Sequence, residues 1–222
     1  MNILITGANR GLGLGFVRHY LELGHQVWAC YRSDSGELSA LHSESLHLLR
    51  WDISTDGEPT GELPARIDLL INNAGIYGPG KDGQSLQSIT SGAMLEVFNI
   101  DCVGPLRVVQ KLAGRLAAAQ GIIANVSSKM GSSEDNGSGG TYAYRAAKAG
   151  LVIVSKSMAV DLANDGVHVI TLHPGWVQTD MTGQTGLIDV HTSVSGMAAV
   201  ITRARNYPAG LFIAFDGKIV PY

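Results

Sequence analysis

Short apolar runs alternate with longer amphipathic segments along this chain. The short runs are rich in β-branched and aromatic residues and end at turn-forming residues, which is typical of strands. Strands are expected at Asn2–Thr6, Gln26–Tyr31, Leu46–Trp51, Asp68–Asn72, Gly121–Val126, Val167–His173 and Leu211–Phe215. Because strands alternate with helical segments, the pattern predicts a parallel sheet that helices cover on both faces.

The longer segments carry apolar residues at helical spacing. Helices are expected at Leu12–Leu23, Gly92–Ala119 and Thr141–Asn164, with a short one around Gly36–His42. Gly24 is placed to cap the first helix, and Pro105 predicts a kink or break in the second. Thr55–Arg66 is rich in glycine and proline, which predicts a short helix or none. Ser132–Gly140 is expected to be a loop, and Gln178–Gly186 a mobile segment near the carboxyl edge of the sheet.

Composition and charge narrow the class of protein. The chain has 222 residues, 45% of them hydrophobic, and its sequence contains no repeat or linker, so a single doubly wound α/β domain over residues 1–222 is expected. A formal net charge of −3 argues against a broad nucleic-acid surface. No apolar run approaches the ~18 residues of a membrane span. Met1–Ile5 shows no basic leader, so no signal peptide is expected.

Cysteine and histidine usage points to a reduced compartment and to no metal site. Cys30 and Cys102 are isolated in apolar segments, as expected for buried thiols. The seven histidines show no metal-ligand spacing. The sequence therefore predicts a cytoplasmic protein without a metal, a nucleic-acid partner or a membrane contact.

A glycine-rich turn joins the first strand to the first helix. Thr6–Gly13 has the spacing G-x-x-x-G-x-G, which differs from the common G-x-G-x-x-G fingerprint. Such a turn can serve tight strand–helix packing alone, but its place before a helix N-terminus also suits a pyrophosphate. The cofactor contacts expected here are Gly7, Asn9, Arg10, Gly11, Leu12 and Gly13.

Two arginines bear on the choice of cofactor. Arg32 ends the second strand, and Arg10 lies inside the glycine turn. An arginine accommodates a 2′-phosphate, whereas a carboxylate at this strand end binds ribose hydroxyls. Ser33 is an additional donor, and Asp34 follows too late for the ribose role. NADP is therefore favoured, and NAD is the alternative. The ordinary interpretation of Arg10 and Arg32 is that both are solvated surface residues.

Further cofactor contacts are expected at the ends of the third and fourth strands. Asn73, Ala74 and Gly75 follow the fourth strand, where asparagines can hold a loop against the ribose or simply cap the strand. Asp52 follows the third strand and is placed to accept a hydrogen bond from adenine, with Ile53 beside it. An ordinary turn-starting aspartate is the alternative.

Tyr144 and Lys148 lie four residues apart where a helical pattern begins. On a helix they share one face, and a nearby ammonium favours the phenolate. Such a tyrosine can exchange a proton with a substrate oxygen. The same spacing is common on exposed helix faces, so the pair alone does not identify a site.

Together these motifs resemble the short-chain dehydrogenase/reductase family over essentially the whole chain. The segments that carry the resemblance are Thr6–Gly13, Asn72–Gly75, Asn125–Ser128, Tyr144–Lys148 and Pro174–Gly175. Asp135–Gly140 and Phe215–Tyr222 are similar to the C-factor-type branch, which is related to small carbonyl reductases. The resemblance implies a Rossmann fold with a seven-stranded parallel sheet in the order 3-2-1-4-5-6-7.

The resemblance also implies the catalytic residues. Ser128, three residues before Gly131, would stabilise the substrate oxygen, with Ser127 supporting it. Tyr144 would donate the proton during hydride transfer; Tyr142 competes with it but has Ala146 four residues on. Lys148 would bind the nicotinamide ribose and lower the pKa of Tyr144. The segment expected around the nicotinamide comprises Pro174, Gly175, Trp176, Val177 and Thr179.

One position departs from the family pattern. The family usually has asparagine three residues before a helix glycine, and counting back from Gly104 gives Asp101. A carboxylate there would stabilise the Lys148 ammonium and oppose its effect on the pKa of Tyr144. A local shift in alignment would instead make Asn99 the functional residue.

The leading function is an NADP-dependent carbonyl reductase or alcohol dehydrogenase with a small-molecule substrate. Trp176, Met181, Tyr77 and Met130 are expected near the pocket and suggest an apolar or aromatic carbonyl compound, although each can serve packing alone. A nucleotide-binding signalling or sensor protein with vestigial chemistry is the alternative. The family further implies a homodimer or homotetramer through the two long helices, whose apolar runs can equally face the core.

Overall fold

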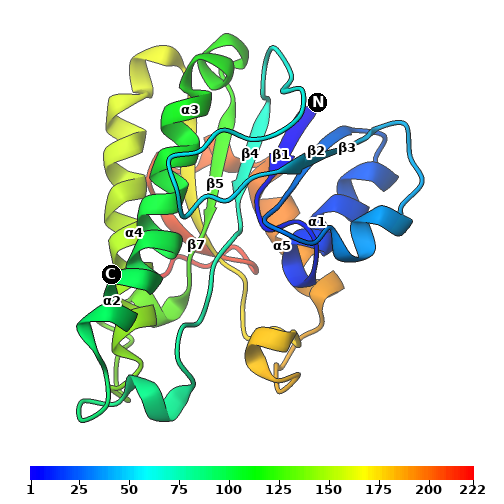
Figure 1. Ribbon diagram of the computed structural model, residues 1–222. Coiled ribbons are helices and arrows are strands. Elements are labelled where there is room, and N and C mark those ends of the chain that lie inside the picture. The colour runs from blue at the N-terminus through cyan, green and yellow to red at the C-terminus, as the bar shows by residue number, and fades with distance from the viewer.

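The structure, a computed structural model, describes residues 1–222 with the side chain of Lys81 excepted, and is built on one parallel sheet (Figure 1). The strands are β1 (Asn2–Ile5), β2 (Gln26–Tyr31), β3 (Leu46–Arg50), β4 (Leu69–Asn72), β5 (Ile122–Val126), β6 (His168–His173) and β7 (Phe212–Ala214). Their order is β3-β2-β1-β4-β5-β6-β7. Both the predicted strands and the predicted order are confirmed.

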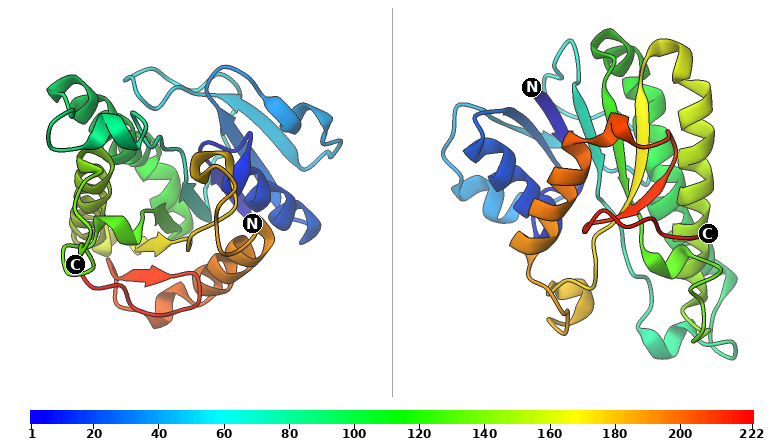
Figure 2. Two further views of the ribbon diagram at one scale, coloured as in Figure 1. Left: turned by 90° about the horizontal axis from the view of Figure 1, so that it is seen from below. Right: turned by 180° about the vertical axis from the view of Figure 1, so that it is seen from behind.

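Helices cover the two faces of the sheet (Figure 2). They are α1 (Gly11–Glu22), α2 (Ser91–Phe98), α3 (Gly104–Ala119), α4 (Tyr142–Asp161) and α5 (Val190–Thr202). Phe16 of α1 and Met197 of α5 share one core with the sheet, whereas Leu112 of α3 and Met158 of α4 share the other. In α3 the apolar residues of the run 108–116 are therefore core-facing. Along α4, by contrast, Ile153 remains 62% exposed.

The long helix predicted at Gly92–Ala119 is interrupted, and the break is not at the proline. A π-helical turn, Asn99–Val103, separates α2 from α3. Pro105 lies in the first turn of α3, two residues after the π-helical turn ends, and has no N–H to donate to a carbonyl oxygen of that turn. The interruption is thus five residues of π-helix, a feature common at functional sites.

Three other segments complete the fold. Helix α5 has no counterpart among the predicted elements, although its Val194 and Met197 are fully buried or nearly so. The short helix expected near residue 36 is a 3₁₀-helix, Gly36–Ala40. No helix forms between residues 55 and 66, and the 132–140 segment is a loop, as predicted. Among the described residues, no helix combines the length and the hydropathy that a membrane crossing would need.

Candidate cofactor and catalytic site

A cavity of about 1360 Å³ opens at the carboxyl ends of the central strands. The segments that follow β1, β2, β3, β4, β5 and β6 line it, together with the start of α4. Every cofactor and catalytic residue predicted from the sequence lines this cavity except Gly13 and Asp101, which are buried next to it. The strand order therefore brings residues from distant parts of the chain to one edge of the sheet.

The glycines of the turn after β1 have different tasks. Gly7 has φ +62°, and a Cβ there would lie 2.7 Å from the Ala74 Cα atom. A Cβ on Gly13 would lie 2.0 Å from the Gly7 carbonyl oxygen. Close packing thus excludes side chains at both positions. At Gly11 the nearest atom is a Thr179 methyl at 3.7 Å, so the backbone at the N-terminus of α1 stays open to a pyrophosphate.

The end of β4 fastens this turn in place. The Asn73 side-chain amide donates to the carbonyl oxygens of Thr6 and Gly7, both at 3.0 Å. In return the Thr6 hydroxyl oxygen accepts the N–H groups of Asn73 and Ala74, at 3.0 and 3.1 Å. These four hydrogen bonds hold the turn in its conformation without a cofactor. Binding therefore costs little conformational entropy in this loop.

The two arginines predicted to choose the cofactor come from the loops after β1 and β2. Arg10 and Arg32 both line the cavity, and the Arg10 guanidinium lies 3.9 Å from the Asp180 carboxylate. Asp34 is used in its own loop, where its carboxylate accepts the Gly36 N–H at 2.9 Å. The Asn9 amide donates to the Asp34 carbonyl oxygen at 3.0 Å. Arg10 and Arg32 thus both line the cavity, and the Asp34 carboxylate is engaged by the backbone of its own loop.

Asp52 follows β3, next to the Arg32 end of β2, and one of its carboxylate oxygens is already occupied. Its Oδ1 accepts the Ser54 N–H at 3.0 Å and the Ser54 hydroxyl at 2.6 Å. The Ser54 hydroxyl is the main reason that the pKa of Asp52 is lowered; burial opposes it, and the Arg32 charge adds to it. Asp52 is therefore an ionised acceptor at the mouth of the cavity.

The first turns of α4 carry the pair that the sequence singled out. Tyr144 and Lys148 are both buried, and the Lys148 Nζ lies 5.6 Å from the centre of the Tyr144 ring. Tyr142 is 39% exposed, so the competing tyrosine lies outside the site. Helical spacing thus places one phenol and one ammonium together in the cavity wall.

The two adjacent serines have separate partners. The Ser128 hydroxyl oxygen accepts the Met130 N–H at 3.2 Å, and the hydroxyl is close enough to the Tyr144 phenol to lower its pKa. Ser127 donates instead to the Lys148 carbonyl oxygen at 2.9 Å. Ser128 therefore faces the phenol, whereas Ser127 supports the backbone of α4.

Asp101 forms a buried ion pair with Lys148. Its Oδ2 lies 3.2 Å from the Lys148 Nζ, with side-chain exposures of 0% and 6%. The other carboxylate oxygen accepts the Ile76 N–H at 2.8 Å, and Lys148 also donates to the Val126 carbonyl oxygen. Asn99 does not take this place, because its amide donates to the Ser54 carbonyl oxygen at 2.9 Å.

The Lys148 and Asp101 charges shift the pKa of Tyr144 in opposite directions. Burial raises it most, the Lys148 ammonium lowers it, and the Asp101 carboxylate raises it again. The hydrogen bond from Ser128 lowers it, Tyr77 raises it, and the net direction is upward. For Lys148, burial is the largest single effect and lowers the pKa, but Asp101, Tyr144 and Cys102 together raise it by more, and the net direction is upward. The acidification expected from the Tyr144–Lys148 pair alone is thus more than offset.

The cavity also contains polar residues that the sequence analysis did not single out. Arg145, Lys129 and His173 line it alongside the predicted Trp176, Met181, Tyr77 and Met130. The Arg145 guanidinium donates to the Met130 carbonyl oxygen at 3.1 Å and to the Ser138 hydroxyl at 2.9 Å. Burial lowers the pKa of His173 to about 4, so its ring is neutral at pH 7. Of these three residues, only Arg145 had a signal in the sequence, namely its position directly after Tyr144.

Comparisons with known proteins agree with this geometry. A sequence model described as short chain dehydrogenase matches residues 1–187. C-signal of Myxococcus xanthus is 40% identical over 157 residues, which are 70% of this chain and 93% of C-signal. The carbonyl reductase Sniffer of D. melanogaster has a TM-score of 0.90 at 29% identity and covers 100% of this chain and 99% of its own. The NADPH-bound carbonyl reductase from chicken fatty liver has a TM-score of 0.87 at 29% identity, with coverage of 100% and 98%.

Proposed function

Because the chain belongs to the short chain dehydrogenase family, in the branch similar to C-signal and carbonyl reductases, we propose that it is an NADP-dependent reductase of ketones or aldehydes. The observation that carries the proposal is the convergence of Ser128, Tyr144 and Lys148 on one cavity that also contains the open glycine turn. The NADPH bound to the chicken carbonyl reductase further supports the choice of cofactor.

The residues present suit a dinucleotide. Gly11 leaves the N-terminus of α1 accessible for a pyrophosphate, and Arg10 with Arg32 supplies charge for a 2′-phosphate. Thr179 and Val177 line the part of the cavity expected to hold the nicotinamide, and Lys148, which also lines the cavity, would bind ribose hydroxyls. When bound, the cofactor supplies the hydride.

The protein's own groups manage the oxygen of the substrate. As a carbonyl is reduced, negative charge grows on its oxygen. Ser128 donates a hydrogen bond to that oxygen, and Tyr144 transfers its phenolic proton to it. The Lys148 ammonium stabilises the phenolate left behind. Tyr77, whose ring centre is 5.1 Å from that of Tyr144, bounds the space in which the substrate lies.

Oxidation of NADPH with a panel of aldehydes and ketones tests this function. A reductase oxidises NADPH only when a carbonyl compound is present, and loses that activity in Tyr144→Phe. The similarity to C-signal favours a second candidate, a nucleotide-binding signalling protein. Binding of NADPH without turnover, equal in wild type and Tyr144→Phe, would support the signalling protein and reject the reductase.

Arg32 is expected to decide the preference for the phosphorylated cofactor. Arg32→Ala should weaken NADPH binding by about 10–100-fold and NADH binding far less, because a charge-assisted hydrogen bond contributes about 1.5–3 kcal/mol. Fluorescence titration with both cofactors measures the difference. Arg18→Ala is the matched control. Arg18 lies on α1, pairs with Glu37 and does not line the cavity. Equal losses for NADH and NADPH would contradict the assignment.

Asp101 is expected to set the pH range of the reaction. Reduction requires a protonated Tyr144, so activity falls as pH rises through the pKa of this tyrosine. The Asp101 carboxylate raises that pKa, and Asp101→Asn removes its charge. The alkaline fall in kcat should therefore move to lower pH in the variant. An unchanged profile with full activity would show that Asp101 has no influence on the phenol.

A further inference from the structure

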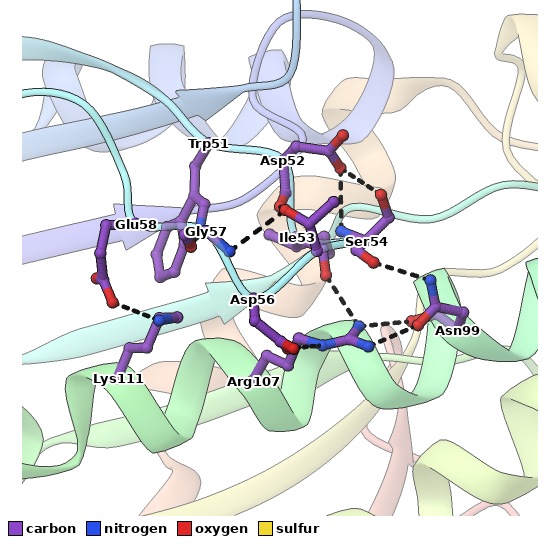
Figure 3. A network of polar contacts seen from close by, with 11 residues as sticks. Trp51, Asp52, Ile53, Ser54, Asp56, Gly57, Glu58, Asn99, Arg107 and Lys111 are labelled. Atoms are coloured by element: carbon purple, nitrogen blue, oxygen red, sulfur yellow. Dashed lines mark hydrogen bonds and ion pairs between the residues drawn. The ribbon is translucent and has the colours of Figure 1, made fainter.

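A single arginine connects three segments beside the cavity (Figure 3). The Arg107 side chain, on α3, is 19% exposed. Its Nε donates to the Asp56 carboxylate at 2.8 Å, and its Nη2 to the Asn99 side-chain oxygen at 2.8 Å. Its Nη1 donates to the carbonyl oxygens of Ile53 and Asn99, at 3.3 and 3.4 Å. All three guanidinium nitrogens are therefore used.

These contacts join the cavity wall to the π-helical turn. Ile53 and Ser54 line the cavity after β3, next to Asp52. Asn99, the first residue of the π-helical turn, donates to the Ser54 carbonyl oxygen while it accepts from Arg107. Ile53 also packs on Gly104, where a Cβ would lie 2.8 Å from the Ile53 Cδ1 atom. The turn is thus held from its first residue to the start of α3.

The π-helical turn needs such support, because π-helix is rare and forms only where its surroundings favour it. Two residues after Asn99, the same turn presents Asp101 to Lys148 and to the Ile76 N–H. We propose that Arg107 is a positioning residue, which through Asn99 and the 52–54 segment keeps the π-helical turn in the register that sets Asp101 against Lys148. Only the kinetic readout of this proposal rests on the proposed function.

Loss of Arg107 has two opposite consequences for Tyr144. The charged or titratable groups that face the Tyr144–Lys148 pair are Asp101, Cys102 and Tyr77. Removal of a cation at Arg107 acts through space and would raise the pKa of a phenol. Release of the π-helical turn instead takes the Asp101 carboxylate away from Tyr144 and lowers that pKa. The sign of the shift therefore separates positioning from simple electrostatics.

Lys111 provides a matched control on the same helix. It lies four residues after Arg107 and pairs with Glu58, in the same loop as Asp56, but has no contact with the π-helical turn (Figure 3). Lys111→Met removes the same charge from nearly the same place. Asn99→Ala is a second test variant, because it removes the side-chain hydrogen bonds to Ser54 and Arg107 without any change of charge.

Amide hydrogen exchange at Ile76 tests the proposal in the cofactor-free protein. The Ile76 N–H donates to Asp101, so its exchange should be about fivefold or more faster in Arg107→Met and Asn99→Ala, and unchanged in Lys111→Met. This measurement requires no turnover, so it remains decisive if the reductase proposal fails. Unchanged exchange in both Arg107→Met and Asn99→Ala would overturn the proposal.

The pH profile of the reductase supplies the second readout. Arg107→Met and Asn99→Ala should move the alkaline fall in kcat to lower pH, as Asp101→Asn does. In a double-mutant cycle, Arg107→Met should add nothing to the shift of Asp101→Asn, because both changes act through the same carboxylate. A shift to higher pH in Arg107→Met, or full additivity in the cycle, would show that Arg107 acts through space and not by positioning.

Discussion

Tyr144→Phe is expected to lower kcat/KM for carbonyl reduction by about 10²–10⁴-fold, the range for loss of a positioned general acid. The phenol is the buried group that faces both Ser128 and Lys148, so the variant keeps the Ser128 hydroxyl but has no group that transfers a proton to the substrate oxygen. The phenyl ring fills the same space, and the packing against Tyr77 is kept. Steady-state kinetics with NADPH and the best carbonyl substrate measure the effect, and titration of NADPH should show a much smaller change.

Tyr142→Phe is the matched control for this experiment. It removes a phenol two residues away on the same helix, from a side chain that is 39% exposed. Its kinetics should equal those of the wild type. Comparable losses in the two variants would mean that the proton does not come from Tyr144.

Lys148→Met is expected to reduce both activity and stability. The methionine has nearly the volume of lysine but leaves the Asp101 carboxylate fully buried without its cation. Breaking a buried ion pair by removing one partner costs about 3–5 kcal/mol. Urea unfolding of the wild type and the variant at pH 7 measures the difference in the free energy of unfolding, and the turnover should be lost in the same variant.

The stability deficit of Lys148→Met should depend on pH with a defined sign. Burial raises the pKa of Asp101, and in the variant Lys148 no longer opposes it. A carboxyl with a raised pKa in the folded state destabilises above that pKa and has no such effect below its unfolded value of about 3.9. The deficit should therefore be larger at pH 8 than at pH 5.

A second substitution at Asp101 separates the broken ion pair from damaged packing. Asp101→Asn combined with Lys148→Met leaves no buried charge, so the double variant should recover most of the lost stability. No recovery in the double variant would mean that the loss comes from packing around residue 148.

The strands and most of the site residues could be predicted because their signals are local. Each strand is a short apolar run, and parallel strands that are buried on both faces cannot contain many polar residues. Once the strands are placed, their carboxyl ends identify the loops that carry Gly11, Asn73 and Ser128. The register argument that preferred Tyr144 to Tyr142 agrees with the exposure of the two side chains.

Helix α5 escaped prediction because its sequence, VHTSVSGMAAVIT, is rich in residues with low helix propensity. Its stability comes from contacts that are distant in the sequence. Gly196 lies against Phe215, where a Cβ would be 2.6 Å from the Phe215 carbonyl oxygen, and Val194 packs close to Gly15 of α1. Tertiary packing thus overrides the local preference, and a single sequence does not display it.

The pairing of Asp101 with Lys148 was expected from the sequence, but not the backbone conformation that produces it. Spacing from Gly104 assigned the position, but not the π-helical turn that turns the side chain toward Lys148. Arg107 gave no signal in the sequence, since the backbone oxygens of Ile53 and Asn99 accept two of its four hydrogen bonds and one side-chain acceptor, Asp56, is 51 residues away in the chain. Contacts to the backbone leave no pattern in the identity of the partner residues.

The π-helical turn also has a consequence for how this chain tolerates changes of length. A π-helical hydrogen bond spans one residue more than an α-helical bond, so the turn between Phe98 and Gly104 amounts to a one-residue insertion in a continuous helix. Deletion of one residue there would let α2 and α3 join, and would rotate everything before it by about 100° relative to α3. Phe98, which now lies against Gly150 of α4, would leave its place, and the carboxylate would swing away from the lysine. The pKa of Tyr144 thus depends partly on the number of residues in this helix, and not only on their identity.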